Sequence, residues 1–442
     1  MRFYLESLGC PKNVVDAQGM VRLLEGMGHE IVDGVLQAQV LVVNTCGFIQ
    51  DAREESLGEL RRLAHKKRPG QVLIAAGCLS QLWGERLMDQ VPGVDAVLGT
   101  RRWGEIDRIV AELEADRTKR QPGRLALLGD PAPAGDGNPA YSRSFARQGA
   151  TAYLKIGEGC SATCGFCTIP RIKGPAISRP VEAVTADAVE LVDRGEQEII
   201  LIAQDTTAYG RDRGNRDGLP GLVEAVLAAA PELRWLRLMY AYPGHVSQRL
   251  IAVMAGDPRV CHYLDLPLQH AHPDVLRRMK RPADVEHTRR LLADLRAALP
   301  DLALRTSLIV GYPGETEAEF QALLDFVGEI RFDRVGVFVY SPEEGTPAAA
   351  LPNPVPDPVK DERRERLMAL QQGISLESNR AQVGRTLPVL VEGQGDGLSV
   401  GRSYRDAPEI DGLVLLPGQA PVGEMVAARI TGAMEYDLIG EI

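Results

Sequence analysis

The stretch Gly159-Cys160-Ser161-Ala162-Thr163-Cys164-Gly165-Phe166-Cys167 places three cysteines in a CxxxCxxC spacing. One loop with this spacing can hold three thiolates around a single metal centre, whereas a structural zinc site or a closed iron–sulfur cube needs four ligands. No fourth cysteine and no histidine stands nearby. The stretch therefore indicates a 4Fe-4S cluster with one iron left open to a ligand. A three-cysteine zinc knuckle and a redox CxxC pair are the alternatives.

With Phe166 just before the last cysteine, this stretch resembles the signature of the radical S-adenosylmethionine (SAM) enzymes. In that superfamily the open iron takes the amino and carboxylate groups of SAM, and electron transfer cleaves SAM to a deoxyadenosyl radical. The resemblance implies that Cys160, Cys164 and Cys167 are cluster ligands and that Phe166 belongs to the cofactor site.

Length and composition narrow the class of protein. The 442 residues leave room for several domains, and the net charge of −10 suits a basic partner better than a broad nucleic-acid footprint. Seven cysteines without an export signal indicate metal ligands rather than disulfides. No apolar run approaches the length of a membrane span, and the first residues are not a secretion signal. We therefore expect a cytoplasmic protein.

Residues 1 to about 115 alternate short apolar runs with amphipathic segments, which is typical of an α/β domain with a parallel sheet. The expected strands are Met1–Ser7, Val40–Asn44 and Val72–Ala76, and the expected helices are Val14–Gly28, Asp51–Lys67 and Gln81–Gln90. Each strand runs into a small-residue turn with a cysteine, namely Cys10, Cys46 or Cys78. Because parallel strands present their carboxyl ends at one edge, these cysteines should converge. Three buried thiols are the alternative, but the repeated position favours a three-cysteine cluster with an open iron.

The residues around these cysteines carry a second resemblance. The segment Ser7-Leu8-Gly9-Cys10-Pro11-Lys12-Asn13-Val14-Val15-Asp16, with Asn44-Thr45-Cys46 and Ala76-Gly77-Cys78, resembles the N-terminal domain of the methylthiotransferases. These radical SAM enzymes insert sulfur and a methyl group at an unactivated C–H bond. The resemblance implies a second 4Fe-4S cluster on Cys10, Cys46 and Cys78 that presents the sulfur.

From Thr151 onward a strand–loop–helix pattern repeats six times, which predicts an open or partial βα barrel. The expected strands are Thr151–Ile156, Glu198–Ala203, Trp235–Met239, His262–Leu266, Ala303–Val310 and Arg334–Tyr340. The CxxxCxxC loop follows the first strand, as it does in the radical SAM superfamily. In such barrels the chemistry lies on loops at the carboxyl ends of the strands.

Several of those loops are unusually polar. Gln204 and Asp205 follow the second strand and Gly311 the fifth, so we predict that they contact SAM or substrate. Plain turn chemistry is the alternative for any one loop. Lys173 and Arg179, beyond the cysteine loop, are further candidates for such contacts.

Three other residues have chemically versatile side chains but no completed site in the sequence. His270 and His272 are expected to be hydrogen-bonding residues of a polar loop rather than metal ligands. Cys261 stands outside both cysteine triads and is expected to be a buried thiol.

The remaining segments complete a multidomain α/β architecture. Residues 118–145 are rich in Pro, Gly and Asp and predict a linker, and Val359–Gln382 predicts a long charged helix. Short strands such as Pro388–Glu392, Gly412–Leu416 and Glu424–Thr431 predict a small antiparallel β-barrel that resembles an OB-fold and the TRAM module. The predicted domains are an N-terminal domain at 1–117, a radical SAM barrel at 146–375 and a TRAM barrel at 378–442.

The charge of the C-terminal module and three short segments of sequence indicate which substrate the protein modifies. In residues 378–442 five basic and nine acidic side chains leave a net charge of −4, whereas a module that grips tRNA phosphates should be basic. The segments Gly9–Asn13, Asp265–His270 and Tyr340–Thr346 resemble the methylthiotransferase branch that modifies an aspartate β-carbon in the twelfth small-subunit ribosomal protein, a basic substrate.

That resemblance implies two 4Fe-4S clusters, SAM, a reductant protein and a sulfur donor, with the substrate free or on the ribosome. A monomer with no membrane partner is expected. A tRNA adenosine methylthiotransferase is the first alternative. A non-catalytic, metal-stabilised nucleic-acid-binding protein is the second.

Overall fold

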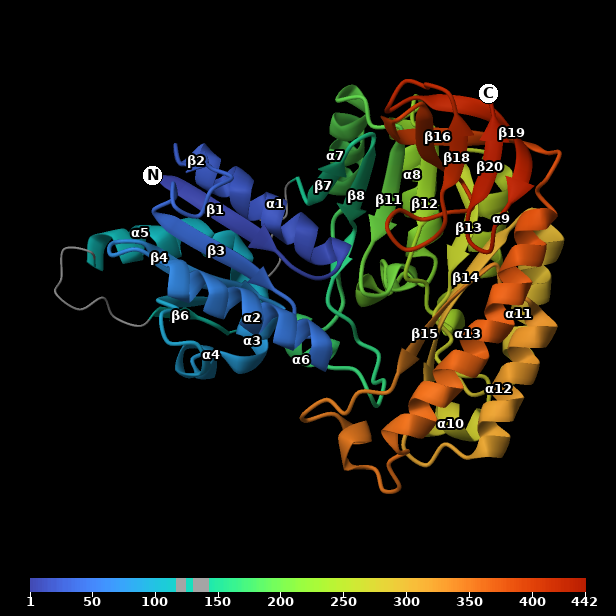
Figure 1. Cartoon of the computed structure of the whole chain (residues 1–442), viewed down its shortest axis with the longest axis horizontal. Coiled ribbons are helices and arrows are strands. Elements are labelled where there is room, and N and C mark those ends of the chain that lie inside the picture. The colour runs from blue at the N-terminus through green and yellow to red at the C-terminus, as the bar shows by residue number, and fades with distance from the viewer. Residues whose placement is uncertain (117–124, 130–142) are drawn as a thin grey trace. The chain divides into compact units, whose positions relative to one another are not determined.

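The computed structural model describes residues 1–116, 125–129 and 143–442 (Figure 1). The chain divides into two compact units. The first comprises Met1–Ala146, Tyr153–Ala162 and Cys167–Ala183, and the second comprises Arg147–Ala152, Thr163–Phe166 and Val184–Ile442. Most of the linker predicted at 118–145 lies outside the described residues, although a short strand, β6, falls inside it at Leu125–Leu127.

The first unit is built on a parallel sheet with the strand order β2-β1-β3-β4-β5-β6. The other strands are β1 (Arg2–Ser7), β2 (Glu30–Ile31), β3 (Val40–Thr45), β4 (Val72–Gly77) and β5 (Ala96–Gly99). The connecting helices are α1 (Pro11–Gly26), α2 (Gln50–Lys66), α3 (Cys78–Trp83), α4 (Arg86–Gln90) and α5 (Ile106–Asp116). The three predicted strands are confirmed to within a residue at each end.

Both faces of this sheet are covered, as the uninterrupted apolar run of β3 requires. Val40 and Val42 pack into one core with residues of α1 and α5, while Leu41 and Val43 pack into a second core with residues of α2. Where we predicted one helix at Gln81–Gln90, the structure has α3 and α4. Gly84, with φ of +55°, separates them.

A second, seven-stranded sheet has the order β15-β14-β13-β12-β11-β8-β7. Its strands are β7 (Phe145–Gln148), β8 (Thr151–Lys155), β11 (Glu198–Ile202), β12 (Trp235–Leu238), β13 (Val260–Asp265), β14 (Ala303–Val310) and β15 (Arg334–Val339). From β11 to β15 neighbouring strands are parallel. This sheet has two edges, so the predicted barrel is open, and its six predicted strands are confirmed.

Helices follow the strands of this sheet in alternation. They are α7 (Val181–Asp193), α8 (Gly218–Ala229), α9 (Gln248–Gly256), α10 (Pro273–Arg278), α11 (Val285–Ala298) and α12 (Glu317–Ile330). Thr316 and Glu319 form a capping box at the start of α12, which explains why that helix begins directly after a glycine-rich loop. Among the described residues, no helix is both long and apolar enough to cross a membrane.

The C-terminal part is a long helix, α13 (Asp357–Arg380), followed by a closed five-stranded barrel in the order β16-β17-β18-β20-β19. The barrel strands are β16 (Thr386–Gly395), β17 (Leu398–Ser403), β18 (Val414–Pro417), β19 (Met425–Ala433) and β20 (Leu438–Glu441). Pairing is antiparallel except between β18 and β20. The sequence did not predict β17, which contains Gly401, or the short β20.

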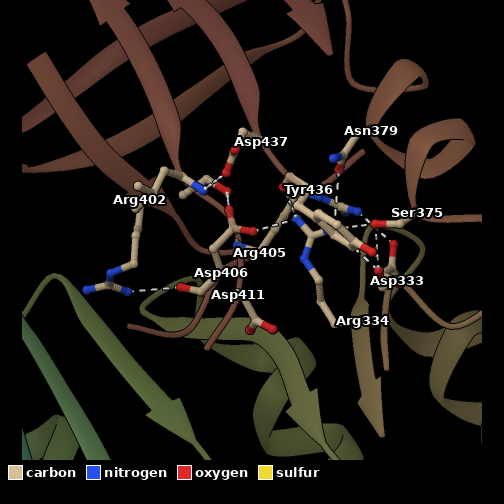
Figure 2. Close-up of polar contacts among 12 residues, drawn as sticks. Asp333, Arg334, Ser375, Asn379, Arg402, Arg405, Asp406, Asp411, Tyr436 and Asp437 are labelled. Carbon is tan, nitrogen blue, oxygen red and sulfur yellow. Dashed lines mark hydrogen bonds and ion pairs between the residues drawn. The ribbon is translucent and has the colours of Figure 1, made fainter. Parts of the chain in front are cut away.

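Buried ion pairs join this barrel to the amino-terminal ends of strands in the second sheet. Figure 2 shows the contacts of Arg405 with Asp333 and of Arg334 with Asp406, at 2.7 and 2.6 Å. Arg402 lies 2.6 Å from Glu198, the first residue of β11. Arg402 and Arg405 are 1% and 4% exposed. Two of the five basic residues of the module are therefore held by the sheet and face away from solvent.

Candidate metal centres

Cys10, Cys46 and Cys78 lie at the carboxyl ends of three adjacent parallel strands of the first unit. Cys10 precedes α1, Cys46 follows β3, and Cys78 is the first residue of α3. The turn predicted at Gly77-Cys78-Leu79 is thus a helix start, with only Gly77 in a left-handed conformation.

These loops touch one another. A Cβ atom on Gly9 would lie 2.8 Å from Cys46 Cβ and 2.9 Å from Cys46 Sγ, so only glycine allows the loop after β1 to approach the loop after β3. The expected convergence of the three cysteines at one sheet edge is therefore what the structure contains.

Asn13 holds the three loops in register. Its side-chain amide donates to the carbonyl oxygens of Leu8 (3.0 Å) and Thr45 (3.1 Å), and its Oδ1 accepts from Cys78 Sγ (3.4 Å). Asn13 is 1% exposed, so these bonds are sheltered from water. One side chain thereby contacts the loop before Cys10, the residue before Cys46, and Cys78 itself.

Burial favours the neutral form of two of these thiols, so a bound metal would have to displace their protons. Burial raises the pKa of Cys46, and the nearby Cys10 raises it further. Burial raises the pKa of Cys78 to about 12, which the positive charge of Lys173 partly opposes. All seven cysteines of the chain are free. Three clustered free thiols, one of them exposed, fit a cluster with three protein ligands and an open position.

The CxxxCxxC loop is divided between the two units, with Cys160 and Cys167 in the first. Gly159, with φ of +78°, allows Cys160 N–H to donate to Gly174 O at 3.0 Å, and a Cβ at Gly159 would lie 2.0 Å from Pro175 O. The amides of Ala162 and Ile169 donate to the sulfurs of Cys160 and Cys167, each at 3.4 Å. Such N–H···S bonds stabilise thiolate charge in iron–sulfur sites.

Cys164 and Phe166 belong to the second unit. Arg281 donates to Cys164 Sγ at 3.8 Å, and its guanidinium lies 4.3 Å from the centroid of the Tyr242 ring. Phe166 packs against a buried cluster that includes Tyr312 and Tyr340. The sequence offered no signal for Arg281, because it is distant from the cysteine loop in the chain.

Asp205, which was predicted to contact SAM, makes hydrogen bonds within the protein. Asp205 Oδ1 accepts from Thr207 Oγ1 (2.5 Å) and from the amide of Ala208 (3.1 Å), and Asp205 Oδ2 lies 2.9 Å from His245 Nδ1. Asp205 therefore caps a short 3₁₀-helix, as turn chemistry would predict. Gln204, next to it, follows β11 at the carboxyl end of the strand. Their role toward SAM stays a prediction.

Gly311 and His270 meet around one carboxylate. Gly311 has φ of +74°, and a Cβ there would lie 2.3 Å from Lys360 Cγ, so contact with α13 suffices to require this glycine. Its amide donates to Glu315 Oε2 at 3.1 Å, and the same oxygen lies 3.6 Å from His270 Nε2. His270 is 1% exposed and accepts from the amide of His272, which agrees with the predicted hydrogen-bonding role.

Lys173 and Arg179, predicted to contact SAM or substrate, are both buried in the first unit. Lys173 donates to Asp16 Oδ2 at 2.9 Å and to Thr100 Oγ1 at 2.6 Å, and Arg179 donates to Lys155 O at 2.7 Å. Sequence reasoning missed Asp16 and Lys155. Asp16 is the last residue of the segment Ser7–Asp16, which resembles the methylthiotransferases, and that resemblance is the signal that could point to it.

Cys261 is confirmed as a buried thiol, 2% exposed. Burial raises its pKa to about 12, in the neighbourhood of Arg237 and Glu198 at the ion-paired contact with the C-terminal barrel. It lies in β13, and neither cysteine triad includes it.

Comparisons with known proteins cover the whole chain. The family descriptions that match are the uncharacterized protein family UPF0004 at residues 2–99, the radical SAM superfamily at 154–327 and the TRAM domain at 383–442. A ribosomal protein uS12 methylthiotransferase RimO of Roseiflexus sp. (strain RS-1) is 51% identical, over 100% of this chain and 97% of the relative. The protein of the same name from Chloroflexus aurantiacus is 50% identical, over 100% and 99%.

Solved structures agree on the fold. The radical SAM methyltransferase TsrM from Kitasatospora setae superposes with a TM-score of 0.59 at 14% identity, covering 84% of this chain and 89% of that one. The cobalamin-dependent SAM radical enzyme OxsB gives a TM-score of 0.52 at 11% identity, covering 84% and 56%.

Proposed function

The chain belongs to the family of ribosomal protein uS12 methylthiotransferases (RimO), and from this we propose that it replaces one β-hydrogen of an aspartate in uS12 by a methylthio group. Membership makes it a radical SAM enzyme that uses two 4Fe-4S clusters and SAM. The observation that carries the proposal is the pair of three-cysteine sets, one at the edge of the first sheet and one in the loop after β8.

We propose that Cys160, Cys164 and Cys167 hold one cluster and that Cys10, Cys46 and Cys78 hold the other. When bound, the first supplies the electron that cleaves SAM and the second supplies the sulfur. The residues around the two sets of cysteines hold the cysteine loops in place and shield them. Asn13 keeps three thiols at one edge, and Arg281 adds a positive charge beside the sulfur of Cys164.

The charge of the C-terminal barrel supports a basic protein rather than tRNA as the substrate. Arg402 and Arg405 are buried in ion pairs with Glu198 and Asp333, so they cannot reach phosphates. The exposed acids of this module are Glu392, Asp396, Glu409, Glu424 and Glu441. Asp406 and Asp411 are buried as well, so the three remaining arginines and seven remaining acids leave the accessible surface of the module with the net charge of −4 that its composition indicates.

Product analysis tests this function. Purified protein, reconstituted anaerobically with iron and sulfide, should hold about eight irons per chain. With SAM and a reductant it should add a methylthio group to uS12, detected by mass spectrometry, and should leave a parallel tRNA sample unmodified. Methylthioadenosine in the tRNA arm would assign the enzyme to the rival branch, and zinc in place of iron would refute both.

We also propose SAM contacts by Phe166, Gln204, Asp205 and Gly311, because these residues lie in the cysteine loop or after β11 and β14. Equilibrium dialysis with SAM tests them. Gln204→Ala should weaken binding, whereas the matched change Gln248→Ala on the exposed side of α9 should not.

We further propose the domain division 1–117, 118–145, 146–375 and 378–442. A cytoplasmic monomer that draws on a reductant protein and a sulfur donor fits this activity. A single mass in light scattering tests the monomer.

A further inference from the structure

Four charged side chains, three of them buried, form a closed network in the first unit. Lys155 Nζ bonds to Asp16 Oδ1 and lies 2.7 Å from Glu158 Oε2, while Lys173 Nζ lies 2.9 Å from Asp16 Oδ2 and 3.3 Å from Glu158 Oε1. The side chains of Asp16, Lys155 and Lys173 are between 2% and 5% exposed. Two lysines and two carboxylates balance, so the network carries no net charge.

The network joins three segments that carry cluster cysteines. Asp16 lies on α1, the helix that begins directly after Cys10. Lys155 is the last residue of β8, shortly before Cys160, and Lys173 is the last residue of α6 (Ile169–Lys173), which begins directly after Thr168 and Cys167. One carboxylate on the Cys10 helix thus binds a lysine on each side of the CxxxCxxC loop.

A second contact supports the same attachment. Arg101, which follows β5, donates to the carbonyl oxygens of Ile172 (2.9 Å) and Arg171 (3.0 Å) in the last turn of α6. These carbonyls are the ones that a helix end leaves without partners. The neighbouring Thr100 accepts from Lys173 at 2.6 Å, so residues of the first sheet hold α6 at two points.

Removing these charges from water costs free energy, so the network is a poor way to stabilise the fold alone. Burial opposes the charges of both lysines, and Asp16 and Glu158 nevertheless raise their pKa values above the usual range. Replacing a buried ion pair by packed apolar residues is often neutral or stabilising, so its presence is better explained by the geometry that it specifies. Lys173 also lies close enough to Cys78 for their charges to interact.

We propose that Asp16 is a positioning residue that, through Lys155 and Lys173, sets the placement of the Cys10/Cys46/Cys78 site relative to Cys160 and Cys167. This proposal rests on the proposed function, since it matters for catalysis only if both sites hold clusters. The yield of methylthio product per SAM cleaved, which needs both sites, is then sensitive to Asp16. Iron content and SAM cleavage, which each depend on one site, are not.

The test compares three variants with the wild type. Asp16→Asn removes the carboxylate that both lysines share. Asp16→Asn/Lys155→Met restores the charge balance of the network, but it does not restore the link from α1 to both sides of the CxxxCxxC loop. Glu25→Gln, on the same helix but exposed, is the matched control. Each protein is assayed for iron content, deoxyadenosine formed from SAM, methylthiolated uS12, and the spin–spin broadening of the electron paramagnetic resonance signal when both clusters are reduced.

We expect both Asp16 variants to retain iron and SAM cleavage within about twofold, and to lose at least about tenfold in methylthiolated product per deoxyadenosine, with altered spin–spin broadening. Glu25→Gln should match the wild type. An unchanged product ratio with unchanged broadening overturns the proposal, and so does loss of iron in both variants, which would make the network purely structural. If the wild type gives no methylthio product, the proposed function fails, but the broadening still decides the role of Asp16.

Discussion

Glu198→Gln should destabilise the contact between the C-terminal barrel and the second sheet. Glu198 is fully buried, with Oε1 at 2.6 Å from Arg237 Nε and Oε2 at 2.6 Å from Arg402 Nη2. The variant keeps the shape of the side chain but removes the negative charge between two buried arginines. Arg402 would keep the negative charge of Glu392, whereas Arg237 would keep its hydrogen bond to the carbonyl oxygen of Tyr404 but lose its carboxylate partner.

The magnitude follows from the pKa of Glu198. Burial alone would raise it, but Arg402 and Arg237 outweigh burial and lower the pKa from 4.5 to about 2. At about 1.4 kcal/mol per pKa unit, this shift corresponds to about 3 kcal/mol. Breaking a buried ion pair by removing one partner costs about 3–5 kcal/mol, which agrees.

Hydrogen exchange followed by mass spectrometry measures the effect locally, through amides of β11, β16 and β17. A loss of about 3 kcal/mol should speed their exchange by about a hundredfold. The matched control is Glu392→Gln, because Glu392 contacts the same Arg402 at 2.7 Å but is 33% exposed. That change should cost no more than about 1 kcal/mol.

The effect also has a defined pH dependence. Because the folded pKa of Glu198 lies below the unfolded one, its stabilisation is fully present above about pH 5 and is lost as the pH falls toward 2. The difference between the wild type and Glu198→Gln should therefore shrink by about half near pH 3. Equal exchange rates in Glu198→Gln and Glu392→Gln at pH 7, or a difference that persists at pH 2, would refute this reasoning.

Three further outcomes are expected. Asn13→Ala removes the bonds that hold the three loops together, so reconstituted protein should retain only about four of about eight irons, measured by colorimetric iron assay. Cys261→Ala should keep all the iron and lower the free energy of unfolding by about 1 kcal/mol in urea titration, whereas Cys78→Ala should lose about half of the iron. Equal iron in those two cysteine variants would contradict the ligand assignment. Arg281→Met removes a positive charge beside Cys164, so potentiometric titration should find a lower reduction potential for that cluster, and an unchanged potential would count against this contact.

Local patterns determined most of the architecture. The strands that end near Cys10, Cys46 and Cys78 are short apolar runs, so their period and their turns can be read without any tertiary information. Six of the seven strands of the second sheet follow from the same kind of pattern. The convergence of the three cysteines also followed, because the carboxyl ends of neighbouring parallel strands share an edge. Gly84 shows the limit, since a single left-handed residue split a helix that the pattern predicted as one.

What the sequence by itself determined is which residues could do chemistry: two sets of three cysteines at spacings and strand ends that point to metal. Only the tertiary structure decided which charges meet. Asp16 with Lys155 and Lys173, and Glu198 with Arg402, are far apart in the chain, and nothing local distinguishes them from solvated charges on a surface. The physical reason is that a charge acquires its partner from burial and three-dimensional proximity, whereas a strand or a cysteine loop is specified by its immediate neighbours.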